Sequence, residues 1–454
     1  MSLHVIGLGV AQHVALDAPA LNALYTADLV FGSARQLETV ASALKEDSLN
    51  ANSLKGRQQT ELLPKLPELE RRLQQLLETR LNSDKRLPAP LIVVLASGDP
   101  LFYGIGKWLA QRFSASDLHF YPAVSSVQAA CHRAAWSLQD VEVLSLHGRP
   151  VDKLRAVLRA GQKIAILSDV QSRPEILAQI CVECGFGEST LLVCEVMGYA
   201  HEKVTKFKAS ELVDAAHDVP EDTQIQFDPL HVTLIELSTP EVSAQQSIPS
   251  FPGFQDKIFI TDKGEGKGMI TKREVRLAIL SLMQAKPRDI IWDIGAGCGS
   301  VSCELVYWNV NRPGSEEGQV YAIEHHPERL SCLEANRHKF GLLSAMSIVN
   351  ARAEEVVASL PKPDKVFVGG SGGQLEQLLI AAWERLDRGG ILVASAVTEA
   401  SKQHLLAFYQ ARAAANDALA ETVQVAVSRG EVLARELMYR PNLPVTLFKW
   451  EKFK

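Results

Sequence analysis

The stretch "IIWDIGAGCGS", residues 290–300, joins a short apolar run to a turn with glycine at every second position. The apolar run predicts a buried strand, and the residues after the turn, Val301 to Trp308, have a helical pattern. A glycine-rich turn between a strand and a helix presents backbone N–H groups and the positive end of the helix to a ligand. We therefore predict a binding site for a nucleotide-like cofactor at this turn.

The next expected strand, "QVYAIE", ends in Glu324. An acid at the tip of the second strand of such a sheet accepts hydrogen bonds from the hydroxyls of a ribose. A dinucleotide-binding turn has the pattern GxGxxG, whereas here Gly295, Gly297 and Gly299 alternate with other residues and Asp293 precedes them, as in enzymes that bind S-adenosylmethionine. The pattern favours S-adenosylmethionine over a nicotinamide cofactor, and a tight turn without a ligand is the remaining alternative.

The composition is that of a folded chain with more than one core. Its 454 residues exceed one ordinary core, so two or three domains are expected. The hydrophobic share is 46%, the charged share is 22%, and no apolar run reaches the length of a membrane span. The first residues, "MSLHVIGLGV", lack the regions of a secretory signal. We expect a cytoplasmic protein with no membrane segment.

Charge and cysteine usage argue against two kinds of partner. The net charge is −6 and the 47 basic residues are scattered, so no basic stripe is available for a nucleic acid. Seven cysteines at irregular spacings favour reduced thiols over a disulfide framework. Cys181 and Cys184 form a CxxC pair, but Cys194 alone does not complete a zinc site. We predict no bound metal and interpret the pair as small buried residues on a helix.

Strand-like and helix-like segments alternate through both halves of the chain, which predicts an α/β fold. The pattern of the first half pauses at residues 121–124, which predicts two lobes. Beyond a Pro-, Ser- and Gln-rich stretch, five strand–helix units and two late strand-like runs predict a Rossmann-like, seven-stranded methyltransferase sheet. The predicted domains are 1–238 and 255–454, joined by a linker at 239–254.

Two further segments flank the predicted cofactor turn. In "GKGMITKREVR", residues 266–276, Thr271 and Glu274 predict a capping box, and the glycines with Met269 predict a flexible lip over a cofactor. In "VFVGGSGG", residues 366–373, the fourth strand is followed by glycines and a serine, where nucleic-acid N-methyltransferases have an Asp or Asn, two prolines and an aromatic residue. Without a side-chain wall, this loop leaves room for a wide, flat substrate.

The segments "GMITKREVR", "DIGAGCGSVS", "NARAEE" and "PDKVFVGGSGG" occur in an order that resembles the decarboxylating methyltransferases of corrin biosynthesis that methylate C15. The resemblance covers Phe254 to Lys454. It implies that the S-adenosylmethionine of this half is held by Thr271, Asp293, Gly295, Ala296, Gly297, Cys298, Gly299, Glu324 and Ala353.

The first half carries a weaker glycine signal, "VIGLGV", which lacks the third glycine of a dinucleotide loop and leaves the roles of Gly7 and Gly9 open. With "FGSARQL", "ASGDPLFYGIG" and "PAVSSVQAA" it resembles the C5-methylating members of the tetrapyrrole methylase superfamily, from Met1 to about Leu237. The resemblance implies a two-lobed fold and a second S-adenosylmethionine, held largely by backbone and loops at Gly98, Asp99, Phe102, Ser125, Ser126 and Met197.

Several of these residues also have simpler interpretations. Asp99 precedes a proline, as ordinary turn residues often do. Arg35, His147 and Arg149 are candidates for binding substrate carboxylates, because an arginine side chain forks onto a carboxylate. A solvated loop explains His147 and Arg149 equally well.

Together the resemblances imply one bifunctional enzyme of cobalamin biosynthesis, related to precorrin-6B (precorrin-6Y) C5,15-methyltransferases. Such an enzyme methylates C5 and C15 of this tetrapyrrole and decarboxylates its C12 acetate to give precorrin-8. One S-adenosylmethionine per domain and a homo-oligomer are expected by resemblance. The electron-rich ring carbons supply the nucleophile, and the protonated ring accepts the electron pair of decarboxylation. Glu274, Lys272 and Ser371 are the candidates for proton handling or carboxylate placement.

Three alternatives stay open. The ring can arrive with cobalt rather than metal-free, although the fusion of both activities favours the metal-free route. The second half can instead methylate RNA or a small molecule unrelated to corrins, against which the scattered basic residues and the glycine-rich loop argue. A module that binds the donor or a tetrapyrrole without reacting is the third alternative, and donor turnover separates it from an enzyme.

Overall fold

The computed structural model describes residues 2–46, 59–81, 90–217, 225–240, 251–264, 268, 270–310, 318–433 and 435–454. Contacts group the chain into two compact units. The first consists of Met1–His147, Gln162–Ile176 and Ser189–Glu236, and the second of Gly148–Gly161, Leu177–Glu188 and Leu237–Lys454. Residues 241–250 of the expected linker, and Met269 of the expected lip, lie outside the described residues, and the domain limits stay a prediction.

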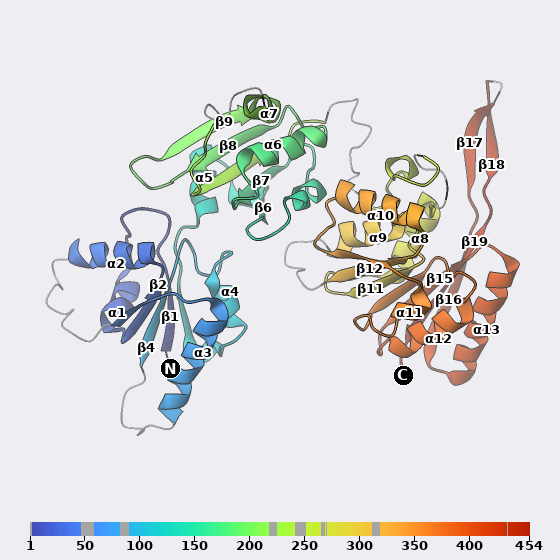
Figure 1. Ribbon diagram of the computed structural model, residues 1–454, viewed down its shortest axis with the longest axis horizontal. Coiled ribbons are helices and arrows are strands. Elements are labelled where there is room, and N and C mark those ends of the chain that lie inside the picture. Colours follow the sequence, from blue (N-terminus) through green and yellow to red (C-terminus); the bar gives the residue numbers. More distant parts are fainter. Residues whose placement is uncertain are drawn as a thin grey trace. The chain divides into compact units, whose positions relative to one another are not determined.

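The first unit begins with a parallel sheet (Figure 1) in the order β3-β2-β4-β1-β5. Its strands are β1 (Ser2–Gly7), β2 (Leu29–Gly32), β3 (Gln59–Leu62), β4 (Leu91–Ala96) and β5 (Leu118–Tyr121), and its helices are α1 (Ala18–Thr26), α2 (Ala34–Glu46), α3 (Leu66–Leu81) and α4 (Ile105–Ala110). Leu69 and Leu73 of α3 are fully buried against β1 and β4, because their spacing places them on one face of the helix.

A second sheet of the same unit is mixed, in the order β6-β7-β10-β8-β9. Its strands are β6 (Val141–Ser145), β7 (Lys163–Leu167), β8 (Thr190–Glu195), β9 (Lys203–Lys208) and β10 (His231–Glu236), and the helices in this part of the chain are α5 (Ser126–Ala134), α6 (Pro174–Glu183) and α7 (Ala209–His217). The two separate sheets confirm the two predicted lobes, since the first ends at β5 and the second begins at β6.

The second unit contains a seven-stranded sheet in the order β13-β12-β11-β14-β15-β19-β16. Its strands are β11 (Ile290–Ile294), β12 (Gln319–Glu324), β13 (Met346–Asn350), β14 (Lys365–Val368), β15 (Ile391–Ala396), β16 (Ala418–Val425) and β19 (Val445–Lys452). The first five strands pair in parallel, and β19 runs antiparallel to both β15 and β16. This arrangement confirms the predicted Rossmann-like methyltransferase sheet.

Helices cover both faces of this sheet (Figure 1). They are α8 (Arg273–Met283), α9 (Ser300–Leu305), α10 (Pro327–Lys339), α11 (Ala353–Val356), α12 (Leu375–Arg385) and α13 (Glu399–Ala415). Two apolar clusters follow this layering: one packs α8, α9 and α10 against the sheet, and the other packs α12 and α13 against it. Because β11, β12, β13 and β14 are parallel, the carboxyl ends of these strands lie at the same edge of the sheet. The loops that follow them meet there.

A long hairpin projects from the edge of the same sheet (Figure 1, red), formed by β17 (Ser428–Leu433) and β18 (Glu436–Pro441). All the described residues of both strands are exposed, including apolar ones such as Val432 and Tyr439. The two late strand-like runs predicted from the sequence, residues 423–429 and 444–450, cover the end of β16 with the start of β17 and most of β19, and the hairpin of β17 and β18 was not predicted.

All seven cysteines are unpaired thiols, and burial raises the pKa of Cys181, in the CxxC pair, to about 12. Among the described residues, no three or more His, Cys, Asp or Glu side chains are arranged to hold a metal ion. Within the same ranges, no helix combines the length and apolar character that crossing a bilayer requires.

Candidate active site

The glycine-rich turn after β11 depends on backbone conformations that favour glycine. Gly295, Gly297 and Gly299 have φ angles of +74°, +62° and +81°, in the left-handed region. A Cβ atom on Gly295 would lie 2.5 Å from the carbonyl oxygen of Gly370, so the turn and the loop after β14 pack backbone against backbone. Gly295 is therefore required by the close approach of two loops as well as by its own backbone conformation.

Asp293 lies beneath this turn rather than in it. Its side chain is buried and accepts hydrogen bonds from the backbone N–H of Ser302, at 3.1 Å, and from the Ser302 hydroxyl. The carboxylate therefore satisfies a backbone donor in the first turn of α9. Burial raises the pKa of Asp293 from 3.8 to about 6, although the hydrogen bonds from Ser302 oppose this shift.

This raised pKa predicts a specific dependence of stability on pH. The folded protein binds the proton of Asp293 more tightly than the unfolded chain, so the favourable contribution of this group is complete below pH 3.8 and is lost as the pH rises through about 6. About two pKa units correspond to about 3 kcal/mol. Asp293→Asn keeps an acceptor for Ser302 but does not titrate. Its stability relative to the wild type should therefore rise by about 2–3 kcal/mol between pH 4 and pH 7.

Urea unfolding of the full chain at several pH values measures this difference. Asp387→Asn is the matched control, because the Asp387 side chain is 74% exposed and pairs with Lys362 on the surface. If the difference in the free energy of unfolding between the wild type and Asp293→Asn does not change with pH, the pKa of Asp293 is not raised in the folded protein.

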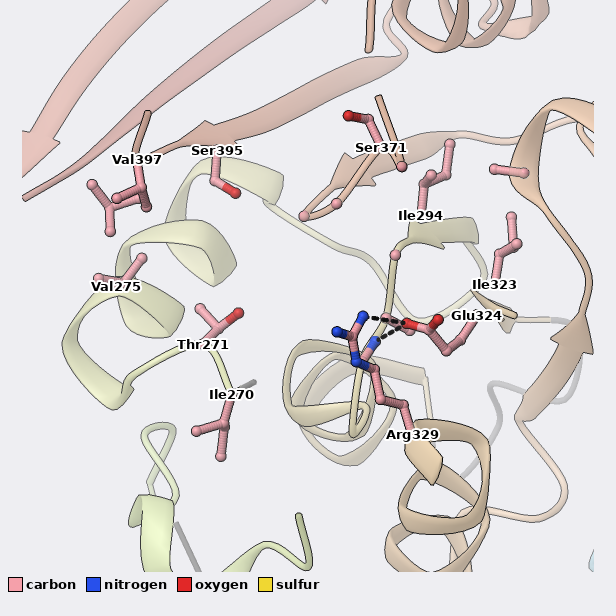
Figure 2. Close-up of a pocket in the computed structure, with 18 of the residues that line it drawn as sticks. Ile270, Thr271, Val275, Ile294, Ile323, Glu324, Arg329, Ser371, Ser395 and Val397 are labelled. Atoms are coloured by element: carbon pink, nitrogen blue, oxygen red, sulfur yellow. Dashed lines mark hydrogen bonds and ion pairs between the residues drawn. The ribbon is translucent and has the colours of Figure 1, made fainter. Parts of the chain in front are cut away.

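Glu324 connects the end of β12 to the glycine-rich turn. Its side chain is 3% exposed, and one carboxylate oxygen accepts from the Gly297 N–H at 3.0 Å. The other oxygen accepts from the N–H groups of His325 and His326, both at 2.9 Å. Arg329 from α10 approaches the same carboxylate at 3.9 Å (Figure 2). Three backbone donors therefore fix this carboxylate at the rim of a cavity.

That cavity has a volume of about 360 Å³ and lies at the carboxyl edge of the sheet. Of the predicted residues, those that line it are Thr271, Lys272, Gly295, Ala296, Gly297, Glu324, Ala353 and Ser371. Thr271 and Glu324 face it from opposite sides (Figure 2). The predicted residues that do not line it are Asp293, Cys298, Gly299 and Glu274. Cys298 is buried, and Gly299 is the N-cap of α9.

The predicted capping box at Thr271 and Glu274 is wrong. Helix α8 begins at Arg273, its N-cap is Lys272, and no side chain caps it. The Thr271 hydroxyl can therefore face the cavity instead of the helix (Figure 2). Glu274 accepts hydrogen bonds from Arg429 at 2.7 Å and from Arg273 at 3.1 Å. Partial burial opposes ionisation of Glu274, but the hydrogen bond and charge of Arg429 outweigh it and lower the pKa of this carboxyl.

A buried ion-pair network that was not predicted from the sequence lies next to the cavity. Arg276 of α8 is fully buried, pairs with Glu304 and Asp256, and donates to the backbone carbonyl groups of Thr271 and Phe254. An arginine between apolar residues in "EVRLAILSLM" was the available signal, because a charge on the apolar face of a helix requires buried partners.

These features fit an adenosine-containing methyl donor. Glu324 supplies the fixed acceptor that a ribose diol needs, and the glycines let a ligand approach the backbone closely. The cavity volume is in the range of small-ligand sites. Its apolar lining includes Val275, Val397, Val425, Val427, Leu443 and Val445.

The loops predicted to hold a donor in the first unit also converge. Gly98, with φ +64°, forms a β-bridge with Gly9, and its Cβ position lies 3.4 Å from the Ser125 Cα. Asp99 accepts from the N–H groups of Leu101, Phe102 and Ala123, at 2.8, 3.1 and 3.3 Å. Asp99 is thus a turn residue that also ties the loop after β4 to the loop after β5.

Other candidates in this unit take backbone or packing roles. Ser125 forms a capping box with Gln128 at the start of α5, which begins at Ser126. Met197 is 5% exposed and packs in an apolar cluster with residues of α5. The Phe102 side chain remains 37% exposed at the loop surface.

The three candidates for carboxylate binding are not brought together by a described contact. Arg35 is exposed near the start of α2 and His147 is exposed after β6. Arg149 is partly buried and belongs to the segment grouped with the second unit. Their roles stay predictions.

The seven-stranded sheet, its glycine-rich turn and the acid ending β12 define the second unit as a Rossmann-like methyltransferase. Residues 262–452 match the precorrin methyltransferase domain family, and residues 2–213 match the tetrapyrrole (corrin/porphyrin) methylases. A Sinorhizobium precorrin-6Y C(5,15)-methyltransferase (decarboxylating) is 33% identical over 99% of this chain and 96% of its own. The chain belongs to this family of decarboxylating precorrin-6Y C5,15-methyltransferases.

Two more relatives have informative lengths. The Mycobacterium tuberculosis protein of the same name is 30% identical over 97% of each chain. A Pyrobaculum calidifontis protein, named a probable cobalt-precorrin-6B C(15)-methyltransferase (decarboxylating), is 39% identical over 147 residues, which are 32% of this chain and 71% of that protein. That relative is therefore long enough for one unit like the second unit of this chain, but too short for two such units.

Proposed function

We propose that this protein uses S-adenosylmethionine to methylate C5 and C15 of precorrin-6B (precorrin-6Y) and decarboxylates its C12 acetate, forming precorrin-8 in cobalamin biosynthesis. The observation that carries the proposal is the 33% identity to a precorrin-6Y C(5,15)-methyltransferase over 99% of the chain, across both units. The donor-shaped cavity beside Glu324 supports it independently, because its residues fit the ribose and backbone contacts of such a donor.

The two methylations and the decarboxylation divide between the two units. The Pyrobaculum relative, named for C15 methylation and decarboxylation, is the size of one unit. The precorrin methyltransferase match, residues 262–452, has this size and contains the cavity. Decarboxylation and C15 methylation are therefore assigned to the second unit, and C5 methylation to the tetrapyrrole methylase unit. Two loop clusters, one in each unit, support one donor per unit.

Within the second unit, the chain binds and orients the methyl donor and excludes water from the site. The bound donor supplies an electrophilic methyl group. Glu324 and the glycine-rich turn fix the donor, since both are held by backbone hydrogen bonds before it arrives. The valine-rich lining of the cavity packs against the ring edge and excludes water from the transfer.

Decarboxylation breaks the bond between the acetate methylene and its carboxyl carbon, releases carbon dioxide, and leaves the electron pair on the protonated ring. Lys272 and Ser371 line the cavity and are the candidates to place the acetate or to handle the ring proton. Glu274 lies outside the cavity and is held in its ionised form by Arg429, which fits positioning better than proton donation.

Ser371→Ala is expected to slow carbon dioxide release and C15 methylation about tenfold, since one hydrogen bond is worth roughly 1–1.5 kcal/mol. C5 methylation should not change. The control is Ser359→Ala, because Ser359 is exposed and its hydroxyl bonds only to the Val356 carbonyl group in the described structure. The rate of decarboxylation is measured as labelled carbon dioxide released from precorrin-6B that carries the label in its C12 acetate. An unchanged rate in Ser371→Ala removes Ser371 from the site.

The metal-free ring is favoured over the cobalt-containing one. The relatives that match nearly the whole chain are named for precorrin-6Y, whereas the cobalt-precorrin relative matches one third of it. Parallel assays with metal-free and cobalt-containing precorrin-6B test this assignment, and turnover of the cobalt form alone would overturn it. A cytoplasmic location and a homo-oligomer remain further predictions.

A further inference from the structure

The hairpin of β17 and β18 is joined to the lip of the donor cavity by charges. The described part of the lip that follows Met269 is residues 270–272, all of which line the cavity. Arg429, near the start of β17, donates to Asp256 at 3.2 Å and to Glu274 at 2.7 Å. Glu274 lies in the first turn of α8, immediately after the lip. One hairpin side chain therefore contacts two acids behind the lip.

The contacts continue from Asp256 to the lip itself. The second oxygen of Asp256 accepts from Arg276 at 3.3 Å, and the Asp256 side chain is only 8% exposed. The same Arg276 nitrogen donates to the Thr271 carbonyl group, while Glu304 pairs with the other edge of the guanidinium. The chain of contacts thus runs from Arg429 through Asp256 and Arg276 to Thr271, whose side chain faces the cavity.

We propose that Arg429 is a positioning residue that clamps the lip from the hairpin and so sets the affinity of the second unit for its methyl donor. Without Arg429, among the described residues, Asp256 keeps its ion pair with Arg276, and Glu274 keeps its ion pair with Arg273. The lip then loses its anchor to the hairpin. Arg276 keeps its pair with Glu304, so its fully buried guanidinium stays paired, and the unit is expected to stay folded although Asp256 then shares Arg276 with Glu304.

The test compares Arg429→Met with Arg440→Met in the full chain. Arg440 lies on β18 and its side chain is 76% exposed. It forms an ion pair at 3.5 Å with Glu431, whose side chain is also exposed. Arg429→Met should raise the KM for S-adenosylmethionine in C15 methylation about three- to tenfold and change kcat less than twofold. Arg440→Met should change neither. Arg429→Lys should be intermediate, because lysine keeps the positive charge but replaces the planar guanidinium, whose Nη2 contacts both acids, with a flexible ammonium group.

The inference rests on the proposed function for its kinetic readout only. Hydrogen exchange of the amides of residues 270–276, measured with S-adenosylhomocysteine bound, needs no turnover. It should speed up in Arg429→Met and stay unchanged in Arg440→Met. Wild-type inactivity would overturn the proposed function and leave this readout intact. Unchanged exchange and KM in Arg429→Met would overturn the clamp, as would an exchange increase spread over the whole second unit.

Discussion

Replacing Glu324 with alanine is expected to lower kcat/KM for C15 methylation about 100-fold or more. The carboxylate is nearly fully buried and holds three backbone N–H groups of the turn and of the loop after β12. Hydrogen bonds to a charged acceptor contribute about 1.5–3 kcal/mol each, and the proposed role of Glu324 gives the ribose diol of the donor two of them. The backbone donors of Gly297, His325 and His326 are also left without their acceptor.

Calorimetric titration with S-adenosylhomocysteine and a kinetic assay of C15 methylation measure this effect. Glu328→Ala is the control, since Glu328 lies nearby in the first turn of α10 but does not line the cavity. C5 methylation should continue in both variants, because we propose that the tetrapyrrole methylase unit performs it. Donor affinity within twofold of the wild type in Glu324→Ala would show that the donor does not use this carboxylate.

The second large effect is expected from Gly295→Ala. A Cβ atom there would lie 2.5 Å from the oxygen and 2.7 Å from the Cα of Gly370, and neither backbone atom can move aside cheaply. The residue also has φ +74°, which costs a residue with a Cβ about 1–2 kcal/mol. With the clash, we expect about 3–5 kcal/mol less stability and loss of carbon dioxide release.

Gly389→Ala separates the clash from the backbone strain. Gly389 has φ +85° and no heavy atom within 4 Å of its Cβ position, so only the strain of about 1–2 kcal/mol applies. Urea unfolding of both variants gives the difference. Equal destabilisation by the two substitutions would mean that the turn and the loop after β14 do not pack as closely as described.

The sequence predicted those parts of the site that depend on local pattern. Strands of five or six apolar residues, a glycine at every second position and an acid at the tip of β12 are local signals, and the seven-stranded sheet was predicted from repeated strand–helix units and two late strand-like runs. The two lobes of the first unit were also predicted, because the pattern pauses after β5. Strands β3 and β9 were missed, since both are largely exposed and lack an apolar run.

The parts that were missed depend on contacts between distant residues. Arg276 meets Glu304 and Asp256 only after α8, α9 and the segment before them have packed together. The two hairpin strands have no buried face, so their apolar side chains do not alternate with polar ones as in a half-buried strand. The sequence pattern therefore did not indicate them. The capping box failed because α8 begins one residue after Lys272, and helix limits vary by one or two residues in ways that local pattern does not fix.

The most direct test of the whole account is mass spectrometry of metal-free precorrin-6B incubated with the full-length protein and methyl-labelled S-adenosylmethionine. The account predicts a product with two labelled methyl groups and one carbon dioxide fewer than the substrate. A folded protein that leaves this ring without a labelled methyl group and without loss of carbon dioxide would contradict it.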